Sequence, residues 1–169
     1  MRMMISIVIG MLMSTLSVAA NFTIKSQGFE NKGKIPDKYT CEGGSVTPSL
    51  IWSNPPDKTK SFALTFKSLD TPVGLLYNWI LYNIPNNVSE LKEGIRTLPE
   101  GTVVGPNSFG EEEYRAPCPP DTLVHRYIIT IYALDIMLDL PNETDADGIM
   151  YQMKNHVLDK AELTGTFSH

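Results

Sequence analysis

The sequence is poor in the residues that metal centres and nucleic-acid surfaces require. It has three histidines and two cysteines in 169 residues, and neither type recurs at the close spacing of a metal-ligand motif. No run of lysines or arginines occurs, and the whole chain carries a formal net charge of −5. We therefore expect no bound metal and no nucleic-acid partner.

Motifs for common enzyme chemistry are also missing. No glycine-rich phosphate loop precedes a helical pattern, and no serine lies in a Gly-x-Ser-x-Gly turn. Asp70 and His125 could act as an acid–base pair, but no nucleophile is matched to them. The sequence therefore predicts a protein that is not an enzyme and that binds no cofactor.

Apolar residues dominate the first twenty positions. Arg2 gives this segment a positive start, and Val18-Ala19-Ala20 supplies the small residues that a signal peptidase recognises. The alternative is a retained membrane anchor, but Ser, Thr and Gly interrupt the apolar stretch, which is shorter than the ~20 residues of a membrane span. We expect residues 1–20 to be a cleaved signal peptide and the mature chain to be periplasmic or secreted.

Residues 21–169 have the length of one domain. No second apolar stretch approaches the length of a membrane span, so we expect no transmembrane segment after cleavage. Arg2 is the one charged residue of the signal, so the mature chain has a net charge of −6. Because cysteines of exported proteins usually pair, we expect a Cys41–Cys118 disulfide, with two free thiols as the alternative.

Apolar patterns predict strands through most of this domain. Residues 22–25 and 62–66 alternate between apolar and polar faces, 79–84 is apolar on both faces, and 127–134 shows the strongest pattern. Proline and glycine clusters separate these segments. One helix is predicted over about 142–157, where apolar residues recur at helical spacing. The pattern is typical of a mostly β domain.

Three segments carry the most distinctive residues. They are Ile35–Gly44 with Thr47–Trp52, then Ser68–Gly74 leading into Asn78-Trp79, and finally Asn107–Gly110 with Tyr114–Pro120 and His125-Arg126-Tyr127. In this order they resemble the phosphatidylethanolamine-binding protein family, and specifically its bacterial branch of Raf-kinase-inhibitor-like proteins. The resemblance covers residues 22–167.

The resemblance implies both a fold and a site. The implied fold is a β-sandwich-like domain in which a central antiparallel sheet packs on a smaller sheet, with a C-terminal α-helix. The implied site is a small pocket for an anionic head group such as phosphate, phosphoethanolamine or that of a phospholipid. Its ligand-binding residues would be Ser68, Asp70, Pro72, Asn78, Pro119, His125 and Tyr127.

Two of these positions depart from the family pattern. Ser68 stands where the family motif begins with Asp, and Asn78 stands where the family has a His before the Trp. Neither side chain carries a charge, so anion binding would depend on His125 and on backbone N–H groups. Asp70 would orient His125 or accept an ammonium group. Arg126 should point away from the pocket and brace a loop carboxylate.

Two functions remain open from the sequence. The first is a non-catalytic binding protein for the anionic head group. The second is an interaction protein with a degenerate pocket, which would inhibit a protease or kinase or modulate a host protein. An open pocket would favour the first, and a pocket filled by Asn78, Tyr127 or Phe109 would favour the second.

Overall fold

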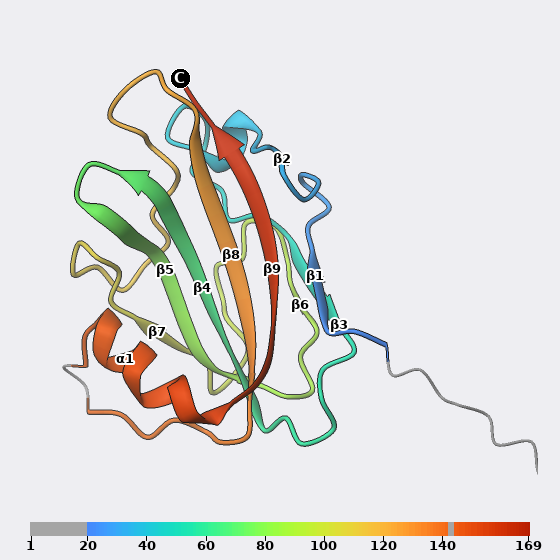
Figure 1. Cartoon of the computed structure of the whole chain (residues 1–169). Coiled ribbons are helices and arrows are strands. Elements are labelled where there is room, and N and C mark those ends of the chain that lie inside the picture. Colours follow the sequence, from blue (N-terminus) through green and yellow to red (C-terminus); the bar gives the residue numbers. More distant parts are fainter. Residues whose placement is uncertain (1–19, 142–143) are drawn as a thin grey trace, which may run out of the picture.

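The computed structural model describes residues 20–141 and 144–169, so the predicted signal peptide lies, except for Ala20, outside the described residues (Figure 1). The described residues form nine strands, one α-helix and two short 3-10 helices. In chain order these are β1 (Thr23–Lys25), β2 (Gly33–Lys34), η1 (Asp37–Tyr39), β3 (Leu50–Ser53), β4 (Ser61–Thr71), β5 (Gly74–Pro85), β6 (Glu90–Leu91), β7 (Val103–Gly105), β8 (His125–Leu134), α1 (Ala146–Met153), η2 (Lys154–His156) and β9 (Val157–Phe167).

The strands form two sheets. The smaller has the order β1-β3-β6, and the larger has the order β2-β9-β8-β4-β5-β7. Every pair is antiparallel except β2 and β9, which run parallel at one edge of the larger sheet. The predicted mostly β architecture, with a central sheet and a smaller one, is therefore confirmed.

Large apolar side chains fill the space between the two sheets. Trp52 of β3 meets Phe62 of β4 edge to face, with ring centroids 5.6 Å apart. Trp79 of β5 and Ile129 of β8 join the same buried cluster. Burying each such side chain stabilises the fold by about 1.5–3 kcal/mol, so this core fixes the strands that carry the site.

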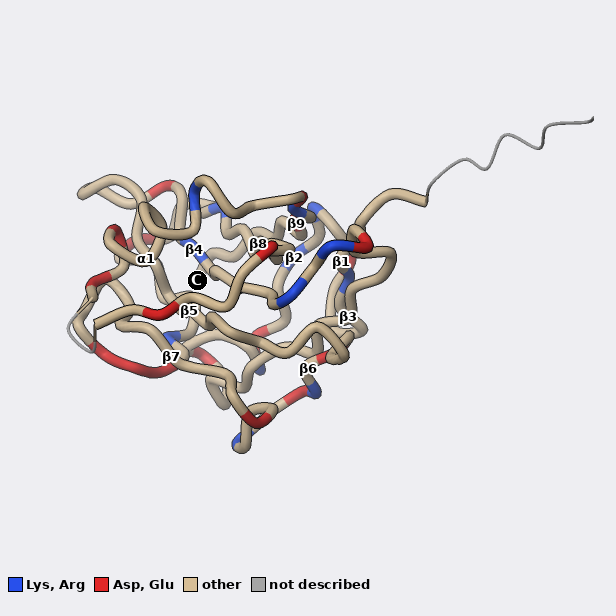
Figure 2. The backbone as a smooth tube through the Cα atoms, turned by 90° about the horizontal axis from the view of Figure 1, so that it is seen from below, with Lys and Arg blue, Asp and Glu red and all other residues tan. Residues whose placement is uncertain are grey.

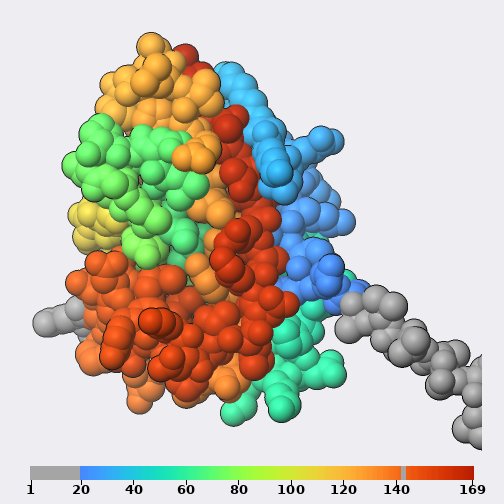
Figure 3. Space-filling view, viewed as in Figure 1, coloured from blue at the N-terminus to red at the C-terminus, as the bar shows by residue number. Residues whose placement is uncertain are grey.

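Helix α1 covers the opposite face of the six-stranded sheet. Ile149 and Met153 are one turn apart and buried, and they pack in one cluster with Ile80 and Leu134 of the sheet. Asp145 caps the helix by accepting a hydrogen bond from the Gly148 backbone N–H at 2.8 Å. Figure 3 shows α1 over the lower half of this face, while the β4–β5 turn and the loop before β8 build the upper end.

The last strand is longer than the sequence predicts. The sequence predicts only a short strand over Leu163–Phe167, whereas β9 begins at Val157 and pairs with β8 along its length. The first half of β9 is polar, with Asp159, Lys160 and Glu162 exposed, so its apolar pattern is weak. The helix is therefore followed by an eleven-residue strand that lies between β2 and β8.

Charged residues of both signs are spread over the described backbone, and basic residues gather on no one face of it (Figure 2). In the part of the chain that the structure describes, no helix is long and apolar enough to cross a membrane. The segment between β5 and β8, which has little apolar periodicity, contains only the short strands β6 and β7. Most of this segment therefore consists of loops outside helices and strands.

Candidate functional site

A cavity of about 300 Å³ lies at one end of the six-stranded sheet. Here β4 turns into β5 and β8 begins, at the upper end of the sheet in Figure 1. The long connection between β7 and β8 closes the remaining sides. The lining residues are Ser68, Thr71, Pro72, Val73, Leu76, Asn78, Phe109, Arg115, Ala116, Cys118, Pro119, Pro120, His125 and Tyr127.

The sheet supplies the buried polar residues of this cavity. Ser68 of β4 lies opposite Tyr127 of β8 in the antiparallel register. The Ser68 hydroxyl donates to Asn78 Oδ1 at 2.6 Å, and Asn78 Nδ2 donates to the Arg115 carbonyl at 3.1 Å. Ser68 and Asn78 are both buried, so these bonds satisfy polar groups that water does not reach well. They also tie the β7–β8 connection to the sheet.

A bulge in β5 places Asn78 at the cavity. Phe66 of β4 pairs with Trp79, but the next residue, Lys67, pairs with Tyr77, so Asn78 is the extra residue between them. A bulge frees backbone groups from the ladder and re-aims a side chain. The freed Asn78 carbonyl accepts a hydrogen bond from the Arg115 backbone N–H at 2.9 Å. Asn78 therefore holds the backbone of Arg115 through two hydrogen bonds.

His125 lines the cavity as the sequence predicts, but its partner is a different carboxylate. Its Nε2 lies 3.0 Å from Asp121 Oδ1, and the ring is buried. The same Asp121 oxygen accepts from the Leu123 backbone N–H at 2.8 Å. This backbone hydrogen bond, with the His125 contact second, lowers the pKa of Asp121, so the carboxylate is ionised and orients the imidazole.

Asp70 requires a correction, because it does not line the cavity. Its carboxylate accepts from Arg126 Nη2 at 2.6 Å and Nε at 2.8 Å, and also from the Arg126 backbone N–H at 2.9 Å. The register between β4 and β5 shifts between Ser68 and Thr71, which breaks the alternation that would place Asp70 beside Ser68. Arg126 braces this carboxylate and lowers the pKa of Asp70 to about 2.

The other six predicted ligand-binding residues all line the cavity, namely Ser68, Pro72, Asn78, Pro119, His125 and Tyr127. Phe109 forms part of the wall and leaves the cavity open. Arg115, which was not among the predicted site residues, also lines the cavity, with its side chain about half exposed. The signal that could have revealed it is its place as the one charged residue of the segment Tyr114–Pro120.

A disulfide fixes the loop beside the cavity. Cys41 and Cys118 are bonded with their Cα atoms 5.4 Å apart, as the sequence predicts. Next to the bond, the Cys41 backbone N–H donates to the Pro117 carbonyl at 3.1 Å. Because Cys118 lines the cavity and Cys41 follows η1, the bond ties one wall of the site to the N-terminal part of the domain.

Three lining side chains have polar atoms that lack a hydrogen-bond partner. Within residues 20–141 and 144–169, the Tyr127 hydroxyl has no hydrogen-bond partner. Within the same ranges, His125 contacts Asp121 through Nε2, which leaves Nδ1 unpaired. Arg115 contacts Glu111 through Nη1, which leaves Nε and Nη2 unpaired in the described part of the chain. Burial raises the pKa of Tyr127 to about 12, so its hydroxyl keeps its proton. The free donors of Arg115 and Tyr127 therefore suit a ligand that offers hydrogen-bond acceptors.

Fold and site together define a class of protein: a two-sheet β domain with one covering helix and an open pocket, lined by apolar and a few polar side chains, at the end of the larger sheet. Residues 25–168 match the family model described as phosphatidylethanolamine-binding protein. The chain therefore belongs to the phosphatidylethanolamine-binding protein family.

Relatives and solved structures agree with this membership. A UPF0098 protein of Methanothermobacter thermautotrophicus is 38% identical over 147 residues, which are 85% of this chain and 97% of the relative. A phosphatidylethanolamine-binding protein homologue from Chlamydia trachomatis, CT736, aligns with a TM-score of 0.81 at 36% identity, covering 88% of this chain and 97% of its own. The Escherichia coli protein YbcL, described as a member of the mammalian family, aligns with a TM-score of 0.83 at 28% identity over 89% and 99% of the two chains.

Proposed function

We propose that this protein is a non-catalytic binding protein, periplasmic or secreted, whose pocket takes a small anionic head group such as phosphate or phosphoethanolamine. The observation that carries this proposal is that, in the described residues, unpaired donors of Arg115 and Tyr127 and the unpaired Nδ1 of His125 belong to side chains that line one cavity of about 300 Å³. A phosphate dianion offers several acceptor oxygens, so the donors of Arg115 and Tyr127 would each gain a charge-assisted hydrogen bond on binding.

The walls also favour binding over chemistry. Ser68 donates its hydroxyl proton to Asn78, and the one imidazole of the cavity is oriented by Asp121 toward the wall. No lining hydroxyl or thiol is within hydrogen-bonding reach of that imidazole in the described residues, so no nucleophile–base pair is assembled. These contacts support a site that holds its ligand without transforming it.

A second candidate is the interaction protein, and the rim of the cavity favours it. Val73, Leu123 and Val124 are large apolar residues that are 79%, 68% and 66% exposed, and Phe109 is 47% exposed. Val73 and Phe109 also line the cavity. Such a rim suits either a partner protein or the apolar part of a larger ligand. Because the cavity is open rather than filled by Phe109, head-group binding remains the first proposal.

Calorimetric titration of the purified mature chain with phosphoethanolamine tests the proposal. We expect binding by the wild type and a loss of about tenfold in affinity for Tyr127→Phe, which removes one donor to a charged acceptor. His125→Gln removes the imidazole that lines the cavity and should weaken binding by a similar factor. His156→Gln is the control, since His156 contacts Asp135 and does not line the cavity. Failure of the wild type to bind phosphoethanolamine or phosphate would move the assignment to the interaction protein.

Export is tested separately. Mass analysis of the protein from the periplasm or medium of the expressing cell should give a chain that begins at Asn21. Retention of Met1 in a cytoplasmic or membrane fraction would contradict this part of the proposal and would leave the pocket assignment unaffected.

A further inference from the structure

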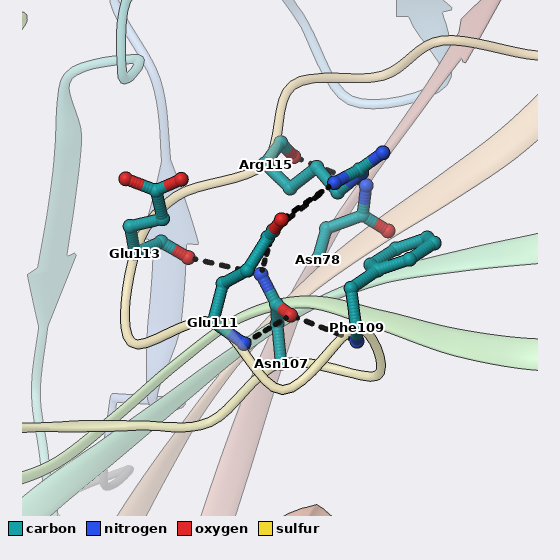
Figure 4. Close-up of polar contacts among 6 residues, drawn as sticks. All are labelled: Asn78, Asn107, Phe109, Glu111, Glu113 and Arg115. Atoms are coloured by element: carbon teal, nitrogen blue, oxygen red, sulfur yellow. Dashed lines mark hydrogen bonds and ion pairs between the residues drawn. The ribbon is translucent and has the colours of Figure 1, made fainter.

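The connection between β7 and β8 forms an ordered turn around one buried amide. Asn107 Oδ1 accepts from the backbone N–H groups of Phe109 at 2.8 Å and Glu111 at 3.1 Å. Its Nδ2 donates to Glu111 Oε2 at 3.1 Å and to the Glu113 carbonyl at 3.4 Å (Figure 4). Asn107 is almost fully buried, so this turn has a defined shape.

This turn positions two side chains against the guanidinium of Arg115. The ring centroid of Phe109 lies 3.8 Å from Arg115 Cζ, and both carboxylate oxygens of Glu111 lie within 3.1 Å of Arg115 Nη1. Asn78 fixes the backbone of Arg115 from the other side. The cation is therefore held at the cavity wall by contacts to its side chain and to its backbone (Figure 4).

The contribution of the Glu111–Arg115 pair to folding stability does not explain this arrangement. The Glu111–Arg115 pair is exposed by more than a third on both sides, and such pairs contribute little to folding. The buried polar residues Ser68 and Asn78 carry no charge, which leaves Arg115 as the permanently charged cation of the cavity lining. Because Glu111 can be displaced, the guanidinium of Arg115 can recognise a negatively charged ligand in the cavity.

We propose that Arg115 selects the ligand by its negative charge and that Glu111 is the internal carboxylate with which the ligand competes for the guanidinium. This inference rests on the proposed function, that the pocket takes an anionic head group. In the described residues Nε and Nη2 of Arg115 have no partner, so a phosphate can first bind these donors and then displace Glu111 from Nη1.

The competition specifies a class of ligand. Glu111 carries one negative charge, as does a phosphodiester, so a diester gains little by replacing it. A phosphomonoester carries nearly two negative charges at neutral pH and therefore displaces Glu111 from Arg115. We therefore assign the site to dianionic phosphomonoesters in preference to phosphodiesters.

Titration calorimetry with phosphoethanolamine at pH 7.5 and low salt tests the role of the pair. Arg115→Gln should bind at least about tenfold more weakly, because a charge-assisted bidentate contact is lost. Glu111→Gln should bind about three- to tenfold more tightly, and its amide oxygen still accepts from Asn107. Glu113→Gln is the matched control: it removes the same charge from the same turn, but its side chain points away from Arg115 (Figure 4). It should change affinity by less than about twofold.

The ligand class is tested with glycerophosphoethanolamine, a phosphodiester with the same amine. The wild type should prefer phosphoethanolamine over this diester by about fivefold or more, and Glu111→Gln should narrow the preference. Equal affinities of wild type and Arg115→Gln for phosphoethanolamine, or equal gains from Glu111→Gln and Glu113→Gln, would overturn the inference while the proposed function stands. No binding of either ligand by the wild type would overturn both. If Arg115→Gln does not fold, the comparison of Glu111→Gln with Glu113→Gln decides alone.

Discussion

Asp70 and Arg126 are joined by three hydrogen bonds that link β4 to the start of β8. Two come from the Arg126 guanidinium and one from its backbone N–H, and all three end on the Asp70 carboxylate. The pair lies at the end of the sheet beside the cavity and does not line the cavity. The residue that the family resemblance places in the pocket thus stabilises the strands that form the pocket.

Asp70→Asn should lower stability at neutral pH by about 1 kcal/mol, because the pair is partly exposed and solvent screens it. The Arg126 contacts lower the pKa of Asp70 to about 2, below its ordinary value of 3.8. The carboxylate therefore stabilises the fold above about pH 4, and this contribution is lost as pH falls toward 2.

Denaturant unfolding of wild type and Asp70→Asn between pH 7 and pH 2 measures this effect. The two curves should be separated above pH 4 and should converge near pH 2. Asp139→Asn, an exposed acidic residue, should follow the wild type throughout. A separation that stays constant down to pH 2 would show that the Asp70 charge is not responsible.

The strands and the core follow from local sequence, but the positions of single side chains at the site do not. Alternation within 62–66 and 127–134 predicts β4 and β8, because a buried face requires it. The bulges that give Asn78 an extra place in β5 and turn Asp70 toward Arg126 have no such local signature. They depend on which strands pair and in which register.

The position of the Arg115 side chain also could not be predicted from local sequence. Its sequence neighbours are prolines and a cysteine, which indicate a rigid loop but not where a side chain lies. Its position depends on Asn78, 37 residues earlier, and on the turn built by Asn107. His125 could be predicted because the family motif includes it, whereas its partner Asp121 becomes visible only in the folded loop.

Asn83 is a second bulge residue with a structural role. Its backbone is left-handed, with φ of 57°, and its buried amide exchanges two 2.8 Å hydrogen bonds with the backbone of Leu138. Asn83→Ala removes both bonds and leaves an alanine in a left-handed conformation that Asn and Gly adopt more readily, so we expect a loss of about 3 kcal/mol. Urea unfolding measures it, with the exposed Asn87→Ala as control; a loss below 1 kcal/mol would contradict the assignment.

His169 connects pH to the loop that carries Pro119. Its Nδ1 lies 2.5 Å from Glu42 Oε1, and its Nε2 lies 2.9 Å from the Pro119 carbonyl. These contacts, with Glu42 the larger, raise the pKa of His169 above its ordinary value of 6.5. The stabilisation is therefore complete below about pH 6.5 and is lost as pH rises through the raised value.

An NMR titration of the His169 ring protons tests this linkage. The midpoint should lie above 6.5 in the wild type and should fall in Glu42→Gln, which keeps an acceptor but loses the charge. Glu100→Gln removes the charge of another exposed glutamate and should leave the midpoint of the His169 titration unchanged. An unchanged midpoint in Glu42→Gln would show that the ion pair does not form in solution.

The Cys41–Cys118 bond should contribute both to stability and to the site. It closes a loop with a sequence separation of 77, for which chain entropy gives roughly 4 kcal/mol of stabilisation. Reduction with a phosphine, or the Cys41→Ser/Cys118→Ser double variant, should lower the melting temperature by roughly 8–16 degrees. Because Cys118 is part of the cavity wall, phosphoethanolamine affinity should fall at temperatures where the reduced chain is still folded. Reoxidation of the reduced wild type should restore both properties, which the double variant does not permit. A reduced protein with unchanged melting temperature would show that the rest of the fold already fixes this loop.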